Sequence, residues 1–387
     1  MKVVISGAGI AGLTLAGRLG ALGHTVEVVE KAAGPRPEGY MIDFFGPGYD
    51  TAERMGLLPR VHELGYHFIE AGYHDEHGRR RVGLSFERFA RSLDGRMTSI
   101  MRPDIEHVLR TALPPGVRVR FGAAVTAVDN RADGVSVRLS DGTALDADLL
   151  VGADGIHSTV RGLVFGPEAE YFRYLGFHTA AFVFEDPEIH RLVAGRFCLT
   201  DTVGRQVGCY GLRDGRVAAF TVHRTPDPTR PDDPRAAVRA AYATLGWIVP
   251  TVLERCPPEI YYDQVAQIEM PRWSSGRVVL VGDACGAVSL LAGQGASLGM
   301  GGAFVLAENL TDLAGYERRW RPVVLDKQRI ARSGARWFLP ATQARLRARR
   351  VAMRLAKLPW VDRRIAVSLV GKPTALVGDQ RTRSGDS

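Results

Sequence analysis

The chain has 387 residues, of which 45% are hydrophobic and 24% charged. These values are ordinary for a globular protein and exclude a disordered or collagen-like chain. The formal net charge of +8 is concentrated at the end of the sequence, because residues 330–387 carry 13 Lys and Arg against 3 Asp and Glu. The rest of the chain therefore has a net charge of −2. Because the body is not basic, we expect no nucleic-acid partner.

Two more classes of protein are excluded by simple patterns. No apolar run approaches the roughly 18 residues needed to span a bilayer, so we expect no integral membrane segment. The four cysteines have no CxxC spacing and no histidines placed like metal ligands. We therefore expect no metal site and a reduced, cytoplasmic protein that is a monomer or a weak homodimer.

The first 30 residues have the pattern of a strand, a helix and a second strand. Residues 2–6 and 25–30 are short apolar runs, and residues 10–22 between them have helical spacing. A unit of this kind implies a parallel sheet with a right-handed crossover.

The turn after the first strand reads Gly-Ala-Gly-Ile-Ala-Gly, the pattern of a dinucleotide-binding turn. Gly7 permits the tight turn, Gly9 lets a pyrophosphate come close, and Gly12 lets the helix lie against the strand. Free N–H groups at the helix N-terminus favour phosphate. Glu30, which ends the second strand, can accept hydrogen bonds from ribose hydroxyls and would repel a 2′-phosphate. The unit predicts NAD or FAD; the alternative is a glycine-rich turn without a ligand.

The elements that follow fall into two patterns. We expect helices at residues 50–64 and 102–113. A β-meander follows, with strands at residues 118–120, 124–130, 135–139 and 145–150 and Asp-Gly turns at 133–134 and 141–142. After about residue 170 we expect strands at 176–185, 196–199, 206–212 and 216–223, a loop at 225–233 and a helix at 234–245. Alternation in these later strands indicates an antiparallel sheet with one buried face and one face toward solvent or ligand.

Two acidic residues follow apolar strands farther along the chain. Asp154, in Gly-Ala-Asp-Gly-Ile-His-Ser-Thr-Val-Arg, is either a ligand-binding acid or the cap of the next helix. Asp283 follows an apolar strand at residues 278–281, at the end where doubly wound sheets bind ligands, and can accept hydrogen bonds from a ribityl chain. Ala-Gly-Gln-Gly-Ala-Ser at residues 292–297 then opens a helix that runs to residue 313, and its N-terminus favours an anion and leaves room for a flat ring.

Together these motifs resemble the single-component FAD-dependent monooxygenases of the aromatic-hydroxylase type, in the short branch of the tetracycline-inactivating monooxygenases. The resemblance implies an α/β fold: a glutathione-reductase-like Rossmann FAD domain with an inserted antiparallel-sheet substrate domain and C-terminal helices. It implies an FAD domain at 1–75, 96–170 and 270–315, a substrate domain at 76–95 and 171–269, a helical segment at 316–370 and a tail at 371–387. The residues it places at FAD are Gly7, Gly9, Ala11, Gly12, Glu30, Lys31, Arg102, Asp154, Asp283, Gly293, Gly295 and Ala296.

The same resemblance implies a reaction. NADPH or NADH would reduce FAD, O2 would form a flavin C4a-hydroperoxide, and one oxygen atom would pass to a bulky, polycyclic aromatic or polyketide-like substrate. On the expected substrate sheet, the candidates for substrate contact are His178, Arg196, Tyr210 and His223, and those for an apolar wall are Phe177, Phe182 and Phe220. For each of them a role in the surface or the core is the alternative. No residue is identifiable as a catalytic base.

Several alternatives stay open at this point. A reductase, a halogenase or a non-redox cyclisation on the same fold would share the FAD motifs. Residues 285–291 lack the His-Pro-rich sequence that many relatives carry there, which leaves the loop beside the flavin less constrained. Residues 345–358 interleave basic and apolar residues as in an amphipathic helix. This helix either binds a membrane surface or an acidic partner, or packs its apolar stripe across both domains with its arginines in solvent.

Overall fold

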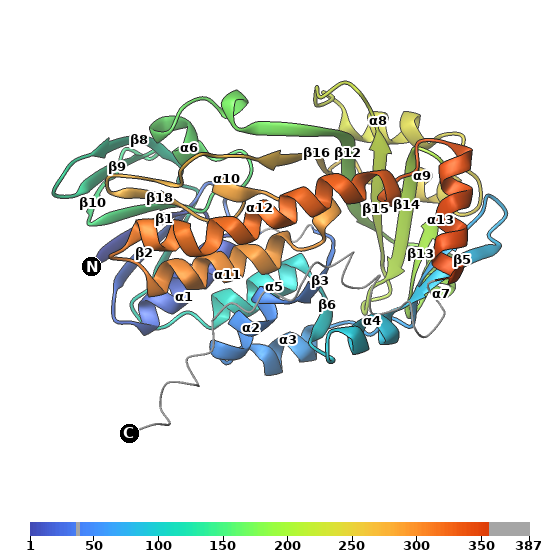
Figure 1. Cartoon of the computed structure of the whole chain (residues 1–387), viewed down its shortest axis with the longest axis horizontal. Helices are drawn as coiled ribbons and strands as arrows, with labels where there is room; N and C mark the ends of the chain where they lie inside the picture. Colours follow the sequence, from blue (N-terminus) through green and yellow to red (C-terminus); the bar gives the residue numbers. More distant parts are fainter. Residues whose placement is uncertain (36–38, 356–387) are drawn as a thin grey trace.

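The computed structural model describes residues 1–35 and 39–355. Two sheets lie toward opposite ends of the elongated molecule, and the long helix α12 (Leu313–Phe338) runs from one to the other (Figure 1). The mixed α/β architecture predicted from the sequence, with a parallel-sheet FAD-type domain and a separate antiparallel sheet, is confirmed.

The first sheet has six strands and carries the dinucleotide-type unit. Its order is β17 (Ser274–Ser275), β18 (Val278–Leu280), β11 (Leu149–Gly152), β1 (Lys2–Ser6), β2 (Thr25–Glu30) and β7 (Arg118–Phe121). All neighbours are parallel except the β17–β18 pair. Helices α1 (Ile10–Ala21) and α11 (Gly295–Glu308) pack against each other beside this sheet. Its central strands β1, β11 and β18 are buried, continuous apolar runs, as expected for a parallel sheet that is covered on both faces.

The β-meander was predicted wrongly at its first and last strands. Three strands form it, β8 (Val125–Asn130), β9 (Val135–Leu139) and β10 (Ala144–Ala147), whereas β7 pairs with β2 in the parallel sheet. The single strand expected at residues 145–150 is two strands that belong to different sheets. The burial pattern marks the break, since β10 alternates between exposed and buried residues and β11 is buried throughout.

A two-stranded ribbon and several short helices connect the two main sheets. The ribbon pairs β3 (Met41–Phe45) with β6 (Met97–Met101), neither of which was expected from the sequence. The helix expected at residues 50–64 is two helices, α2 (Pro47–Arg54) and α3 (Leu58–Leu64), separated at Gly56, whose φ is +71°. The remaining short elements are α4 (Phe86–Ser92), α5 (Arg102–Thr111), α6 (Thr159–Val164), the 3-10 turns η1 (Glu168–Glu170) and η2 (Leu290–Ala292), and α10 (Asp283–Gly286).

The second sheet has seven strands and is antiparallel apart from one pair. Its order is β16 (Tyr261–Ile268), β12 (Phe172–Phe184), β15 (Val217–Arg224), β14 (Arg205–Gly211), β13 (Arg196–Thr200), β4 (Glu70–His74) and β5 (Arg80–Ser85). Helices α7 (Pro187–Val193), α8 (Pro234–Tyr242) and α9 (Val249–Glu254) cover one face and share a hydrophobic core with it. The β4–β5 hairpin belongs wholly to this sheet, so the sheet begins at residue 70 rather than after the expected boundary at residue 75.

The last described helix, α13 (Gln343–Leu355), packs against the second sheet through arginine rather than through a continuous apolar stripe. Leu346 and Arg349 are buried, whereas Val351 and Leu355 are each 54% exposed. Buried Asp201, beyond the end of β13, pairs with both Arg349 and Arg350. The arginines expected in solvent therefore provide part of the interface. The remainder of the basic segment lies outside the described residues, among which no helix is long and apolar enough to cross a membrane.

Candidate functional site

The glycine turn after β1 has no room for any other residue at two of its positions. A Cβ on Gly12 would lie 1.9 Å from the carbonyl oxygen of Gly7, and one on Gly7 would lie 2.5 Å from that of Ala153. Gly7 also has a φ of +109°, which L side chains rarely adopt. At Gly9 a Cβ would meet its nearest neighbours at 3.8 Å, so the turn leaves space on the side that faces the cavity. The N-terminus of α1 is thereby open to a phosphate group.

Glu30 is fixed beside this turn by two backbone groups. Its Oε2 accepts a hydrogen bond from the Ala8 N–H, and its Oε1 accepts one from the Ala32 N–H, both at 2.9 Å. Because each carboxylate oxygen can accept a second hydrogen bond, the residue retains capacity toward a ribose. Lys31, the next residue, is exposed at the surface. The end of β2 therefore provides the acid that the sequence predicted, held by backbone groups of the turn itself.

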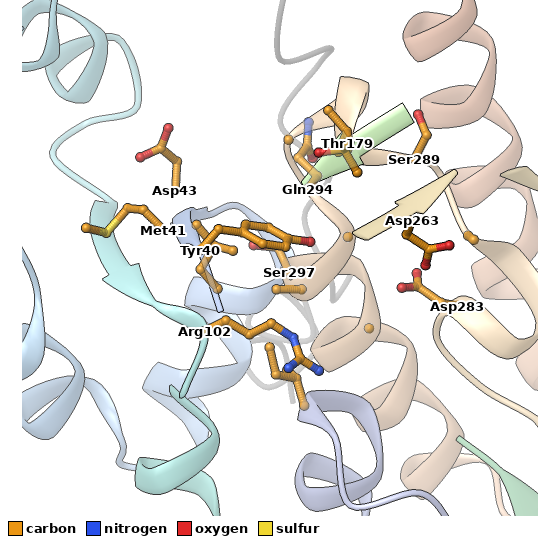
Figure 2. Close-up of a pocket in the computed structure, with 18 of the residues that line it drawn as sticks. Tyr40, Met41, Asp43, Arg102, Thr179, Asp263, Asp283, Ser289, Gln294 and Ser297 are labelled. Carbon is orange, nitrogen blue, oxygen red and sulfur yellow. The ribbon is translucent and has the colours of Figure 1, made fainter. Parts of the chain in front are cut away.

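A cavity of about 390 Å³ extends from the glycine turn to strands of the seven-stranded sheet. Figure 2 shows some of the side chains that line it, among them Tyr40, Arg102 and Asp283. Elements of both sheets and of the helices between them contribute to its wall. The predicted FAD residues that line it are Gly9, Ala11, Arg102, Asp283, Gly293, Gly295 and Ala296. Gly7, Gly12, Glu30, Lys31 and Asp154 lie around it without lining it.

Arg102 enters the cavity from the first residue of α5, where Pro103 follows at a helix position that tolerates proline. Its Nη2 lies 2.8 Å from Oε1 of Glu106, one turn farther along the helix. Glu106 is only 7% exposed, so this ion pair anchors the Arg102 guanidinium to the buried side of α5. Arg102 itself remains on the cavity wall.

Asp283 reaches the cavity from the opposite side, after the sharp turn at Gly282. Gly282 has a φ of +66°, and a Cβ there would lie 2.9 Å from Cβ of Ala11. The side chain of Asp283 points toward Asp263 of β16 (Figure 2). The surrounding protein removes the Asp283 carboxyl group from water and so raises its pKa. The charge of Arg102 opposes this effect, and that of Asp263 reinforces it. A carboxylate in these surroundings is suited to accept hydrogen bonds from hydroxyl groups such as those of a ribityl chain.

The N-terminus of α11 adds a buried polar group to the cavity wall. Ser297 is 1% exposed and lines the cavity, and among the described residues its Oγ has no hydrogen-bond partner. Buried hydroxyl groups are nearly always hydrogen-bonded, so this one indicates a ligand atom in the cavity. Together with the space left by Gly9 and the exposed N-terminus of α11, it fits a flavin cofactor.

Comparison with known proteins gives the family. The model of the FAD binding domain family matches residues 1–320, most of the chain. The chain belongs to this FAD-binding family. The resemblance to flavin-dependent monooxygenases that its motifs predicted is confirmed, as is FAD as the cofactor of the family.

Relatives and solved structures agree with this assignment. An uncharacterized protein of Mycobacterium tuberculosis is 35% identical over 321 residues, which cover 80% of this chain and 84% of the relative. A flavin-dependent monooxygenase from an unknown prokaryotic organism is 28% identical over 326 residues, 80% of each chain. The crystal structure of a tetracycline destructase superposes with a TM-score of 0.81 at 22% identity, covering 98% of this chain and 99% of that one, which shows the shared fold.

In this FAD-binding protein the carboxylate of Asp154 contacts the start of α6, whose N-cap residue is Ser158. Its Oδ1 accepts a hydrogen bond from the Ser158 hydroxyl, and its Oδ2 accepts one from the Val160 N–H at 3.1 Å. Burial raises the pKa of Asp154, against the effect of these hydrogen bonds. Its neighbours Ala153 and Gly155 line the cavity, whereas Asp154 itself does not. Its contacts within the protein therefore support the start of α6, and a role of Asp154 toward a ligand stays a prediction.

His157, which the sequence analysis did not single out, joins the same motif to the second sheet. Its Nδ1 lies 3.0 Å from Oε1 of Glu168, and its Nε2 lies 3.2 Å from Oδ1 of Asp263. The hydrogen bond with Asp263 raises the pKa of His157 by more than burial lowers it. Glu168 also pairs with Arg161, which is fully buried. This network fixes Asp263 at the cavity wall from behind.

The four predicted substrate residues lie on two different faces of the seven-stranded sheet. Tyr210 faces the cavity, and its hydroxyl accepts a hydrogen bond from the Met41 N–H at 2.6 Å. His178 and His223 pair across β12 and β15 on the face that α8 covers, and Arg196 is exposed. Alternation along a strand explains the difference, since neighbours of these residues, namely Thr179 and Phe197, line the cavity instead.

The two histidines on the covered face predict a loss of stability in acid. Burial lowers the pKa of both, that of His223 to about 4, with a further lowering from His178 and Arg205. The folded protein therefore binds fewer protons than the unfolded chain below pH ~6.5. The contribution of His223 to stability is complete above that pH and is lost as the pH falls toward about 4, by up to about 1.4 kcal/mol per pH unit. The contribution of His178 is lost in the same direction.

Urea denaturation at pH 7.5 and pH 5 measures this effect. We expect His223→Gln, which can keep a hydrogen bond to the Tyr242 hydroxyl, to reduce the difference between the two midpoints. His107→Gln, at an exposed position of α5, is the matched control. An unchanged pH dependence in the His223 variant would show that other groups govern acid unfolding.

Several cavity residues were missed by sequence reasoning because nothing local marks them. They come from the segment that forms β3, from β16, from the residues before β4 and at the start of α4, and from the loop after α10: Tyr40, Met41, Asp43, Phe68, Phe86, Tyr261, Asp263, Gln264 and Ser289. Gln294 and Ser297 also line the cavity and belong to the motif at residues 292–297, although neither was named as a site residue. The apolar wall predicted from three phenylalanines is formed by Phe220 alone among them, because Phe182 lies in the core under the helices and Phe177 packs with Leu339.

Proposed function

We propose that this protein uses NADPH or NADH and O2 to insert one oxygen atom into a bulky, polycyclic aromatic or polyketide-like substrate. The observation that carries the proposal is the continuity of the cavity, which joins the flavin site to a chamber walled by aromatic side chains. A relative named flavin-dependent monooxygenase, 28% identical over 80% of this chain, supports the reaction class.

The residues on the cavity wall have distinct tasks in such an enzyme. FAD, when bound, supplies the redox and oxygen chemistry, and the protein has to bind it, orient it and exclude water. Gly9 and the N-terminus of α1 would hold the pyrophosphate, Asp283 the ribityl hydroxyls, and Ser297 a polar atom of the ring system. Arg102, anchored by Glu106, would set the position of the flavin relative to the chamber.

The second sheet closes the chamber. Phe197, Tyr210 and Phe220 project from three neighbouring strands, so a flat molecule held against them would lie across the cavity from the flavin site. Aromatic walls of this kind favour planar apolar ligands and displace water from the reacting groups. We expect substrate specificity to reside in these strands and in the segment around β3.

Turnover in air tests the proposal. The FAD-loaded protein is mixed with NADPH or NADH, and nicotinamide absorbance and O2 uptake are followed with and without polycyclic phenols. We expect a substrate that accelerates both and a product that gains one atom from isotope-labelled O2. A reductase would consume the nicotinamide without labelling a product, and a non-redox cyclase would form product without consuming O2. Either result would overturn the proposed monooxygenase activity.

A further inference from the structure

The chamber beneath the seven-stranded sheet is aromatic on several sides. The side chains that form it come from both the sheet and the segments that face it: Phe68, Phe86, Phe197, Tyr210 and Phe220. At its border with the flavin site, the ring of Tyr40 lies 6.1 Å from that of Phe220 and 5.7 Å from that of Tyr261. The rings of both pairs are tilted by 47° to each other, and together they provide apolar surface against which a planar ligand can pack.

Acidic side chains outnumber basic ones on the wall of the whole cavity. Among the described residues these are three carboxylates, Asp43, Asp263 and Asp283, and one guanidinium, that of Arg102. The guanidinium is already paired with Glu106 at 2.8 Å. Asp263 and Asp283 face each other near the flavin site, and Asp43 lies apart from them on β3 (Figure 2).

Asp43 belongs to the aromatic chamber. The neighbouring Met41 packs with Phe68, Phe197 and Tyr210 in one hydrophobic cluster, which places this part of β3 against the sheet. The carboxylate is fixed by one strong hydrogen bond, from the Ser99 hydroxyl to Oδ1 at 2.6 Å. The acceptor capacity of Oδ2 remains for a ligand, since each carboxylate oxygen can accept two hydrogen bonds.

A carboxylate in an apolar chamber selects strongly among ligands by charge. A second anion placed there would lose its hydration and meet a like charge, without a cation among the described residues of this chamber to compensate. A protonated amine would gain a charge-assisted hydrogen bond to Asp43 and a favourable position over the surrounding rings. A neutral hydroxyl would gain an ordinary hydrogen bond.

We propose that the substrate is an aromatic molecule that presents a protonated amine, or second best a hydroxyl group, to Asp43 and carries no carboxylate at that end. This inference rests on the proposed function in one respect, because it takes the aromatic chamber for the substrate site. It concerns binding and can therefore be tested without turnover.

Three probes with the same ring test the charge preference: naphthylmethylamine, naphthylmethanol and naphthoate. Each is titrated at neutral pH into the FAD-loaded protein, and binding is followed by the change in the flavin absorption spectrum. We expect the amine to bind at least about tenfold more tightly than the carboxylate, equivalent to about 1.4 kcal/mol, with the alcohol between them. Equal or tighter binding of naphthoate, or no binding of any probe, would overturn the inference.

Asp43→Asn locates the preference. The substitution keeps the shape of the side chain and an acceptor for Ser99 but removes the charge, so we expect the affinities for amine and carboxylate to come within about threefold of each other. Asp104→Asn, the same change at a half-buried position of α5 outside the cavity, should retain the wild-type preference. If the Asp43 variant still preferred the amine to the carboxylate, a group other than Asp43 would cause the preference.

Failure of this inference and failure of the proposed function are distinguishable. If the protein binds the amine selectively but consumes no O2 with any substrate, the charge preference stands and the monooxygenase activity does not. If it oxygenates substrates but prefers the carboxylate probe, the reverse holds. FAD content is measured in each variant, so that a loss of probe binding is not confused with a loss of flavin.

Discussion

Replacing Gly12 with alanine should yield a protein that is purified without flavin and regains it only weakly when FAD is added. The added Cβ would lie 1.9 Å from the carbonyl oxygen of Gly7, and the sheet and α1 hold the backbone of both residues in place. The turn has to open to admit the methyl group, which moves the N–H groups at the start of α1 away from the pyrophosphate position. We expect FAD affinity to fall by at least about a hundredfold, roughly 2.7 kcal/mol.

The flavin-to-protein ratio after purification and an FAD titration of the stripped protein measure this effect. Gly162→Ala is the matched control, because Gly162 lies in α6 and a Cβ there would meet nothing within 4 Å. Alanine is favoured over glycine inside a helix by about 1 kcal/mol, so this variant should bind FAD normally with unchanged or slightly raised stability. A Gly12 variant with wild-type FAD affinity would show that the turn is not the pyrophosphate site.

The flavin end of the cavity could be predicted because its determinants are local in sequence. Each of its parts is a strand, a tight turn and a helix within about a dozen residues, and turns that require glycine leave a signature at fixed positions. The pattern at the ends of β1 and β18 pointed to Gly9 and Asp283, and both residues line the cavity. Glu30 was found by the same reasoning, although the two backbone hydrogen bonds that orient its carboxylate were not.

The substrate end could not be predicted because it depends on register and on long-range contacts. A shift of one residue along a strand exchanges its two faces, so the sequence could not decide whether His178 or Thr179 faces the cavity. The pairing of β12 with β16 shifts between Tyr174 and His178, which adds an irregularity that alternation alone cannot reveal. Asp43 lies on a strand whose partner, β6, is about fifty residues away in the sequence, and neither strand was expected.

The C-terminal helix shows a similar limit of prediction. Its interleaved basic and apolar residues correctly indicated an amphipathic helix, but the face that it buries is determined by a partner 148 residues away. Asp201 lies just beyond a short strand, in a sequence with no feature that marks it as the counter-ion of two arginines. Arginines of a basic helix can hold it in place when a buried carboxylate of the neighbouring sheet pairs with them. The pattern of apolar residues then predicts the wrong buried face for the helix.

Removing the charge of Asp201 should release helix α13 from the second sheet. Asp201 has a fully buried side chain, with Oδ1 2.8 Å from Nη2 of Arg349 and Oδ2 2.6 Å from Nε of Arg350. Asp201→Asn preserves the shape but leaves two positive charges at the interface without an anion. Breaking a buried ion pair in this way costs about 3–5 kcal/mol, so we expect a large fall in the free energy of unfolding or the local detachment of α13.

Urea denaturation and limited proteolysis separate these two outcomes, since detachment of α13 exposes a cleavage site near residue 343 while the rest of the protein stays folded. Glu308→Gln is the matched control: it breaks the pair between Arg18 and Glu308, whose side chains are 28% and 41% exposed, and should cost less than about 1 kcal/mol. If the Asp201 variant were as stable and as resistant to protease as this control, the two guanidinium groups would have to find water at the interface. The ion pair would then determine where the helix docks without contributing measurably to stability.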